Sequence, residues 1–129
     1  TLAELLSEVD ASLLPRLDGI SAVAQPHCHQ HAVMGFETDT ALLSRSGAEV
    51  TAVGGCCGLA GNFGVVQGHY DVSVAVADTS LLPALDAQAE LNPGGIALAD
   101  GFSCRTQIEA LTGRRAVHLA EMLADRLPG

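Results

Sequence analysis

The chain has 129 residues, a formal net charge of −9 and a hydrophobic fraction of 48%, and all six of its basic residues are arginine. It is long enough for one domain with a core of its own, and an acidic chain without a basic patch argues against nucleic acid and anionic membranes as partners. No apolar run approaches the roughly 20 residues of a membrane span, and residues 1–10 lack the basic start of a signal peptide. We therefore expect a cytoplasmic protein, whose association with a membrane, if any, is through a partner.

Apolar spacing along the chain predicts an alternation of helices and short strands. In chain order we predict helices over 2–6 and 13–17, a strand over 20–24, a helix over 33–46, a strand over 49–53, helices over 63–77 and 81–89, a strand over 96–99, a helix over 105–111, a strand over 115–117 and a helix over 119–127. Such an alternation is typical of an α/β fold, here a small parallel sheet of three or four strands with helices packed on it.

Several of these boundaries rest on specific residues. Pro15 breaks the helical spacing of 13–17, and Gly47 and Gly113 are stop signals just beyond two predicted helices. Ser103 is a candidate N-cap for the helix over 105–111. Valines two residues apart within 63–77 also fit a strand, but the length of this segment favours a helix.

The four cysteines all follow predicted strands. Cys28 comes after the first strand, Cys56 and Cys57 after the second, and Cys104 after the third. In a parallel sheet the carboxyl ends of the strands share one edge, and ligands bind there. We therefore expect the four thiols to meet at that edge, and His118, just after the fourth strand, to lie within reach of it.

Four convergent thiols are suited to an inorganic centre. Their spacing matches neither the paired knuckles of zinc fingers nor the compact ferredoxin run, but four thiolates are the usual ligands of a [4Fe–4S] cluster. The side chains of Cys56 and Cys57 point apart, so they suit two irons of a cluster better than one ion. Glycines within 54–64 let backbone N–H groups approach the sulphur atoms. Zinc bound by Cys and His, a redox dithiol at Cys56 and Cys57, and buried cysteines without a site are the alternatives.

Histidines surround the first cysteine and give a second signal. Each is a candidate metal ligand, a proton carrier or a neighbour that tunes a cluster. These candidates are His27, His29, His31 and His118. His29 and His31 also fit polar positions at a helix start, and His69 fits a buried, hydrogen-bonded position on a helix. Arg105 is expected either to stabilise an anionic group or to lie exposed on its helix, and no catalytic residue is predicted.

Three motifs resemble the cysteine-rich CCG domain of heterodisulfide reductase B subunits, glycolate oxidase iron–sulphur subunits and lactate-utilisation proteins. They are Gln-Pro-His-Cys-His-Gln at 25–30, Gly-Cys-Cys-Gly-Leu-Ala-Gly-Asn-Phe-Gly at 55–64 and Asp-Gly-Phe-Ser-Cys-Arg-Thr-Gln at 100–107. More closely, the chain resembles the C-terminal part of FAD-linked dehydrogenases that oxidise D-2-hydroxy acids such as D-2-hydroxyglutarate or D-lactate. It departs from the CCG pattern at Gln107, where that pattern usually has a further Cys.

The resemblance implies that residues 1–129 are a single CCG-type domain, a C-terminal fragment of a larger flavoprotein. It implies an electron relay in which one [4Fe–4S] cluster, held by the four cysteines, takes electrons from FAD bound upstream and passes them to an unidentified acceptor. The missing thiol at Gln107 leaves ligands for one ordinary cluster, and the fragment alone would lack a flavin and turnover. The alternative function is a zinc-binding structural or docking module without a redox role.

Overall fold

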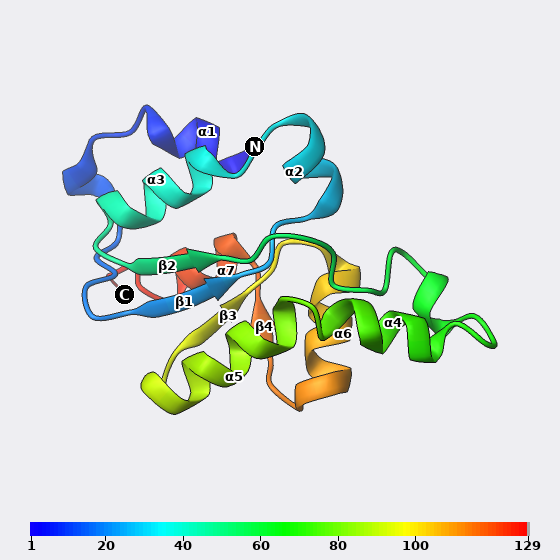
Figure 1. Cartoon of the computed structure of the whole chain (residues 1–129). Helices are drawn as coiled ribbons and strands as arrows, with labels where there is room; N and C mark the ends of the chain where they lie inside the picture. Colours follow the sequence, from blue (N-terminus) through cyan, green and yellow to red (C-terminus); the bar gives the residue numbers. More distant parts are fainter. Residues whose placement is uncertain (129) are drawn as a thin grey trace.

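Four short strands form one parallel sheet in the order β2-β1-β3-β4 (Figure 1). They are β1 (Ser21–Ala24), β2 (Glu49–Ala52), β3 (Ile96–Leu98) and β4 (Ala116–Val117) in the computed structural model, which describes residues 1–128. The predicted α/β fold with a small parallel sheet is thereby confirmed, with the four strands at the expected places.

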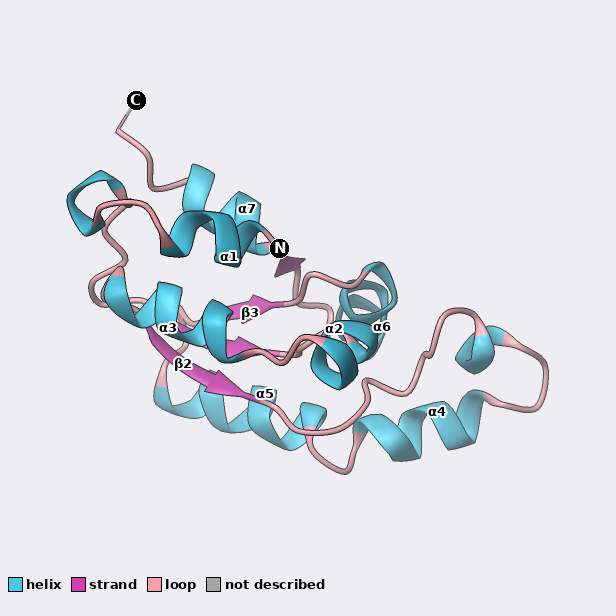
Figure 2. Ribbon diagram, turned by 90° about the horizontal axis from the view of Figure 1, so that it is seen from above, coloured by secondary structure: helices cyan, strands magenta, loops and turns pink. Residues whose placement is uncertain are grey.

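Helices pack on both faces of this sheet, as Figure 2 shows from above. The helices are α1 (Leu2–Ser7), α2 (Cys28–Val33), α3 (Glu37–Arg45), α4 (Tyr70–Ala77), α5 (Leu81–Leu91), α6 (Phe102–Thr112) and α7 (Leu119–Ala124). Helices α1, α3 and α7 share one apolar cluster with the sheet, and α5 and α6 share the other. Within residues 1–128 no helix combines the length and the apolar character needed to cross a membrane.

Alternation along the central strand β1 divides the core between the two faces. Ala22 and Ala24 point into the cluster with α1, α3 and α7, whereas Val23 points into the cluster with α5 and α6. Leu43 and Leu85 are almost completely buried in these two layers, and each such leucine contributes about 1.5–3 kcal/mol of hydrophobic stabilisation. The small residues of β1 allow both helix layers to approach closely.

Two predicted helices in the first half of the chain differ from the structure: one is absent and the other is replaced by two shorter helices. The helix over 13–17 is absent: a short 3-10 turn (Ala11–Leu13) is followed by extended backbone at Leu14, because Pro15 disfavours helical geometry in the residue before it. The helix over 33–46 is replaced by α2 and α3. The chain turns between them at Gly35, whose φ of +75° is left-handed.

The predicted helix over 63–77 is also shorter than expected. A 3-10 turn (Phe63–Val65) comes first, and α4 begins only at Tyr70, after Gly68 with a φ of +87°. Ser103 does not cap α6, which begins at Phe102 with Gly101 as its N-cap residue. The predicted stop at Gly113 is confirmed by its left-handed φ of +70°.

Candidate functional site

The carboxyl ends of three neighbouring strands lead directly to the four cysteines. β1 runs into α2, whose first residue is Cys28; β2 runs into the loop with Cys56 and Cys57; and β3 runs into α6 with Cys104 (Figure 1). The Sγ atoms of Cys28 and Cys56 lie 3.9 Å apart. Cys57 and Cys104 lie in the same buried cluster. The predicted placement of the cysteines at this edge is therefore confirmed.

The four thiols differ in burial, and all four are free. Cys57 and Cys104 are almost completely buried, Cys56 is half-buried and Cys28 is exposed. The site thus has an inner pair of thiols in the apolar layer that α5 and α6 share, and an outer pair of which Cys28 is exposed. A partner can therefore approach the thiols from the side of Cys28.

The two buried thiols, Cys57 and Cys104, have pKa values that shift in opposite directions. A hydrogen bond from the Cys104 thiol, helped by the backbone N–H groups of Leu59 and Ala60, lowers the pKa of Cys57 from 9.0 to about 6. The same bond, together with burial, raises the pKa of Cys104. Burial and the neighbouring Cys56 raise the pKa of Cys28. Cys57 is therefore the thiol that this environment best stabilises as an anion.

A curled loop after β2 provides the N–H donors. The Gly58 N–H donates to the Sγ of Cys56 at 3.3 Å, in addition to the two N–H groups that face Cys57. Left-handed backbone at Gly58 (φ +94°), Ala60 (φ +47°) and Gly61 (φ +72°) curls the loop so that successive N–H groups face inward. Backbone N–H groups in such a concave arrangement stabilise anions, here sulphur anions.

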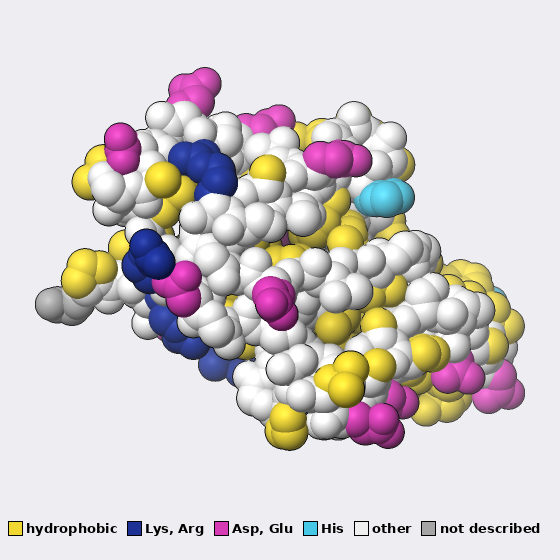
Figure 3. All heavy atoms as spheres, turned by 60° about the vertical axis from the view of Figure 1, so that its left-hand side comes forward, with side chains coloured by type: hydrophobic (Ala, Val, Ile, Leu, Met, Phe, Trp, Pro, Cys, Tyr) yellow, Lys and Arg dark blue, Asp and Glu magenta, His cyan; other side chains and the backbone are white. Residues whose placement is uncertain are grey.

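His27 lies near the thiol of Cys104. It precedes α2 as its N-cap residue, and a Cβ added at Gly101 would lie 2.6 Å from the His27 ring and 3.2 Å from the Sγ of Cys104. Only a glycine fits between these two side chains. His29 and His31 are exposed on α2, in agreement with polar positions at a helix start. His31 lines a groove of about 460 Å³ beside the end of β2. Figure 3 shows one face of the molecule, on which a histidine lies beside a hollow with hydrophobic side chains in it.

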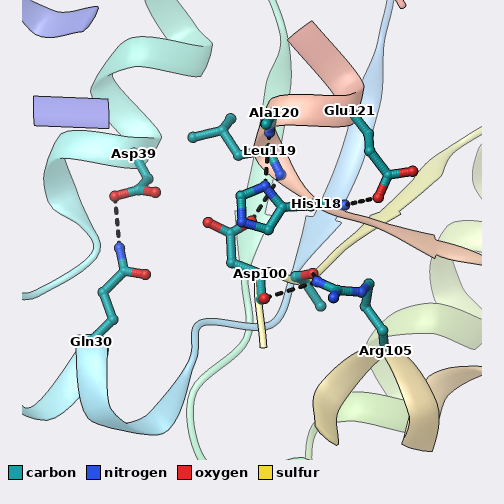
Figure 4. A network of polar contacts seen from close by, with 9 residues as sticks. Gln30, Asp39, Asp100, Arg105, His118, Leu119, Ala120 and Glu121 are labelled. Carbon is teal, nitrogen blue, oxygen red and sulfur yellow. Dashed lines mark hydrogen bonds and ion pairs between the residues drawn. The ribbon is translucent and has the colours of Figure 1, made fainter. Parts of the chain in front are cut away.

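His118 contacts a carboxylate. As the N-cap residue of α7, it accepts a hydrogen bond at Nδ1 from the N–H of Ala120, which places the proton of a neutral ring on Nε2 (Figure 4). Nε2 lies 3.7 Å from Oδ1 of Asp100, and that oxygen also accepts the Leu119 N–H at 2.8 Å. This network holds the β3–α6 corner against the start of α7.

A cavity of about 330 Å³ lies between α2 and the start of α7. Its lining includes His27, His29, His118, Asp39 and Asp100. Burial and the nearby Asp100 carboxylate raise the pKa of Asp39, which accepts a hydrogen bond from Gln30. Among residues 1–128, no group of three or more His, Cys, Asp or Glu side chains is arranged so that it could hold a metal ion. The metal-binding roles of the histidines and cysteines therefore stay predictions.

Two further expectations need correction. Arg105 is neither exposed nor directed at an anion: its guanidinium donates to the carbonyl oxygens of Ala99 and Asp100, and so fixes the turn after β3 (Figure 4). His69 is not buried within a helix. It is half-buried at the N-cap position of α4 and stacks on the Phe63 ring, with 4.2 Å between the ring centroids.

The sequence was compared with known proteins. No family model and no solved structure matches it. The D-2-hydroxyglutarate dehydrogenase of Escherichia coli K12 is 30% identical over 124 residues, which are 94% of this chain and 12% of the relative. The D-2-hydroxyglutarate dehydrogenase of Pseudomonas putida is 32% identical over 74 residues, 57% of this chain and 7% of the relative. The chain is similar to a small part of larger dehydrogenases.

A second kind of relative also matches this chain over only a small part of its own length. One subunit of the anaerobic glycerol-3-phosphate dehydrogenase of Escherichia coli K12 is 31% identical over 111 residues, which are 84% of this chain and 26% of that subunit. The chain thus spans between 7% and 26% of the length of these relatives. The names of these relatives refer to different substrates.

Proposed function

We propose that this chain is the iron–sulphur electron-relay domain of a larger FAD-linked dehydrogenase that acts on D-2-hydroxy acids. Cys28, Cys56, Cys57 and Cys104 would hold one [4Fe–4S] cluster, and FAD would bind in another part of the same protein. The observation that carries this proposal is the gathering of four free thiols from three strand ends at one sheet edge.

The donor set fits such a cluster chemically. When bound, a [4Fe–4S] cluster supplies one-electron transfer. Three backbone N–H groups face the sulphur atoms of Cys56 and Cys57, and donors of this kind stabilise the additional negative charge of a reduced centre. The exposed side of Cys28 leaves a route to a partner, and the apolar layer around Cys57 and Cys104 excludes water.

The two alternative functions, a zinc-binding module and a dithiol redox site, would use the same cysteines in different ways. A zinc-binding module would use the same thiols, together with neighbouring histidines, around one ion. A dithiol redox site has a specific observation in its favour at Cys57 and Cys104, and not at the pair Cys56 and Cys57 considered from the sequence, because the Cys57 anion is stabilised by the Cys104 thiol. Its reaction would join these two sulphur atoms in a disulfide, with two electrons passed to an oxidant such as a partner disulfide or flavin and the proton of the Cys104 thiol released.

Cysteine-to-serine variants distinguish these functions. After anaerobic reconstitution with iron and sulphide, the unmodified protein should give the EPR signal of a reduced [4Fe–4S] cluster, and Cys28→Ser should lose most of it because one ligand is missing. A redox dithiol at Cys57 and Cys104 does not include Cys28, so Cys28→Ser would leave its oxidation and reduction unchanged. An unmodified protein that binds one zinc ion and no iron under strict exclusion of oxygen would overturn the proposal.

A further inference from the structure

Beneath the thiol loop lies a buried hydrogen bond between two helices that belong to different parts of the sequence. The side-chain N–H of Gln107 on α6 donates to the hydroxyl of Ser73 on α4 at 2.9 Å. Both side chains are almost completely buried, with exposed fractions of 5% and 2%. A buried bond of this kind is expensive to break, because the remaining partner loses water without gaining a substitute.

Ser73 contacts the loop at two points. A Cβ at Gly58 would lie 2.1 Å from the backbone oxygen of Ser73, so these backbones pack together more closely than any other residue would allow. A Cβ at Gly64 would lie 2.3 Å from the Ser73 hydroxyl oxygen. The amide of Gln107 also borders Gly58, at 3.2 Å from the same added Cβ. Gly58 and Gly64, the two ends of the segment 58–64, therefore both pack against Ser73.

Gln107 connects this support to the fourth thiol. It lies three residues after Cys104 on α6, so the two side chains share one face of the helix. Cys104 lies in the same buried cluster as Cys57, the residue directly before Gly58. The bond between Gln107 and Ser73 joins α6 to α4, and Ser73 in turn packs against Gly58 and Gly64 of the loop that follows Cys57.

We propose that Ser73 and Gln107 are positioning residues of the thiol site: their hydrogen bond fixes the loop at 58–64 against α6, and so keeps the N–H groups of Gly58, Leu59 and Ala60 aimed at sulphur. Neither side chain bonds to a thiol, so both act through the backbone of the loop. The consequence for a bound cluster rests on the function proposed above, whereas the consequence for the loop does not.

The first test uses the metal-free protein. Ser73→Ala and Gln107→Met each remove the bond with little change in volume, and Gln67→Met on the exposed chain before α4 is the matched control. We expect amide hydrogen exchange at Gly58, Leu59 and Ala60 to become about tenfold faster in both variants and to stay unchanged in the control. Unchanged exchange in a folded Ser73→Ala protein would overturn the inference, even if Gln107→Met fails to fold.

The second test measures the midpoint potential of the reconstituted protein by EPR-monitored titration. Loss of aimed N–H groups disfavours the reduced state, so we expect the ratio of reduced to oxidised centre at a fixed potential to fall about tenfold, which is 59 mV for one electron. The double variant Ser73→Ala/Gln107→Met should shift no further than either single variant, because all three lack the same bond.

Additive shifts in the double variant, or no shift in any, would contradict the inference. If the unmodified protein takes up no cluster, the proposed function fails at that step. The exchange measurement in the metal-free protein then still decides the positioning role.

Discussion

Gly58 is the residue of the thiol loop that tolerates a side chain least. Its φ is +94°, and an added Cβ would lie 2.1 Å from the backbone oxygen of Ser73. Gly61 is a matched control, because its φ is +72° but nothing lies within 4 Å of an added Cβ. Strained backbone at a residue other than glycine costs of order 1–3 kcal/mol, and displacement of neighbouring backbone adds to it.

We therefore expect Gly61→Ala to lower the free energy of unfolding by about 1 kcal/mol and Gly58→Ala to lower it by about 3 kcal/mol. Urea denaturation of the metal-free protein measures both values. Equal losses in the two variants would mean that the close contact with Ser73 is not present in solution.

The raised pKa of Asp39 predicts how the stability of the protein depends on pH. Burial and Asp100 raise the pKa of Asp39 above its ordinary value of 3.8, so the folded protein holds a proton at pH values where the unfolded chain has released it. The contribution of Asp39 to stability is therefore fully present below pH 3.8 and is lost as the pH rises through the folded-state pKa.

Asp39→Asn removes this ionisation and keeps an oxygen that accepts the hydrogen bond from Gln30. We expect the variant to gain stability relative to the unmodified protein as the pH rises above 3.8, until the difference becomes constant above the raised pKa. Free energies of unfolding measured from pH 3 to 8 test this. Parallel pH profiles for the two proteins would refute it.

Residue-level contacts are also where sequence analysis reaches its limit. The sequence marks Cys28, Cys56, Cys57 and Cys104, because cysteines after strand ends carry a recognisable chemistry. It does not mark Ser73, whose valine-rich surroundings in α4 are uninformative about the loop that packs on it. The contact between Ser73 and Gln107 exists only through tertiary structure, and no local pattern in either segment predicts it.

Among the elements, the predicted strands agree with the structure better than the predicted helices do. The strands are short apolar runs bounded by turn residues, and all four occur in the sheet. The helical pattern over 33–46 continues through Gly35 in sequence, but the left-handed backbone at that residue separates α2 from α3. The consequence is functional, because the separate helix α2 begins at Cys28 and orients its thiol at the edge.

The connection between α5 and β3 is held together by Arg114. Its guanidinium donates to the carbonyl oxygen of Leu85 at 3.1 Å, to the side-chain oxygen of Gln88 at 2.6 Å and to the carbonyl oxygen of Gly95 at 3.2 Å. We expect Arg114→Met to lower the free energy of unfolding by about 2 kcal/mol, since hydrogen bonds to charged groups contribute more than neutral ones.

Arg126 offers the control for this substitution, because it lies exposed near the end of the chain. Arg126→Met should change the free energy of unfolding by less than about 0.5 kcal/mol. Similar losses in the two variants, measured by thermal or urea unfolding, would show that the contacts of Arg114 do not stabilise the connection.

For the whole molecule, net charge and the comparisons bear on where a substrate would bind. The chain carries a formal net charge of −9. An anionic 2-hydroxy acid would therefore meet net repulsion from this chain. The relatives, with different substrates in their names, extend far beyond the segment that they share with this chain. The function proposed above, with electron transfer in this chain and substrate binding elsewhere in a larger protein, agrees with these observations.

The central claim is that the four thiols hold one [4Fe–4S] cluster, and the most direct test is a count of iron and acid-labile sulphide in the anaerobically reconstituted protein. The account predicts about four iron and four sulphide per chain, together with the EPR signal of one cluster after reduction. A protein that stays folded under these conditions and retains neither iron nor sulphide would contradict it.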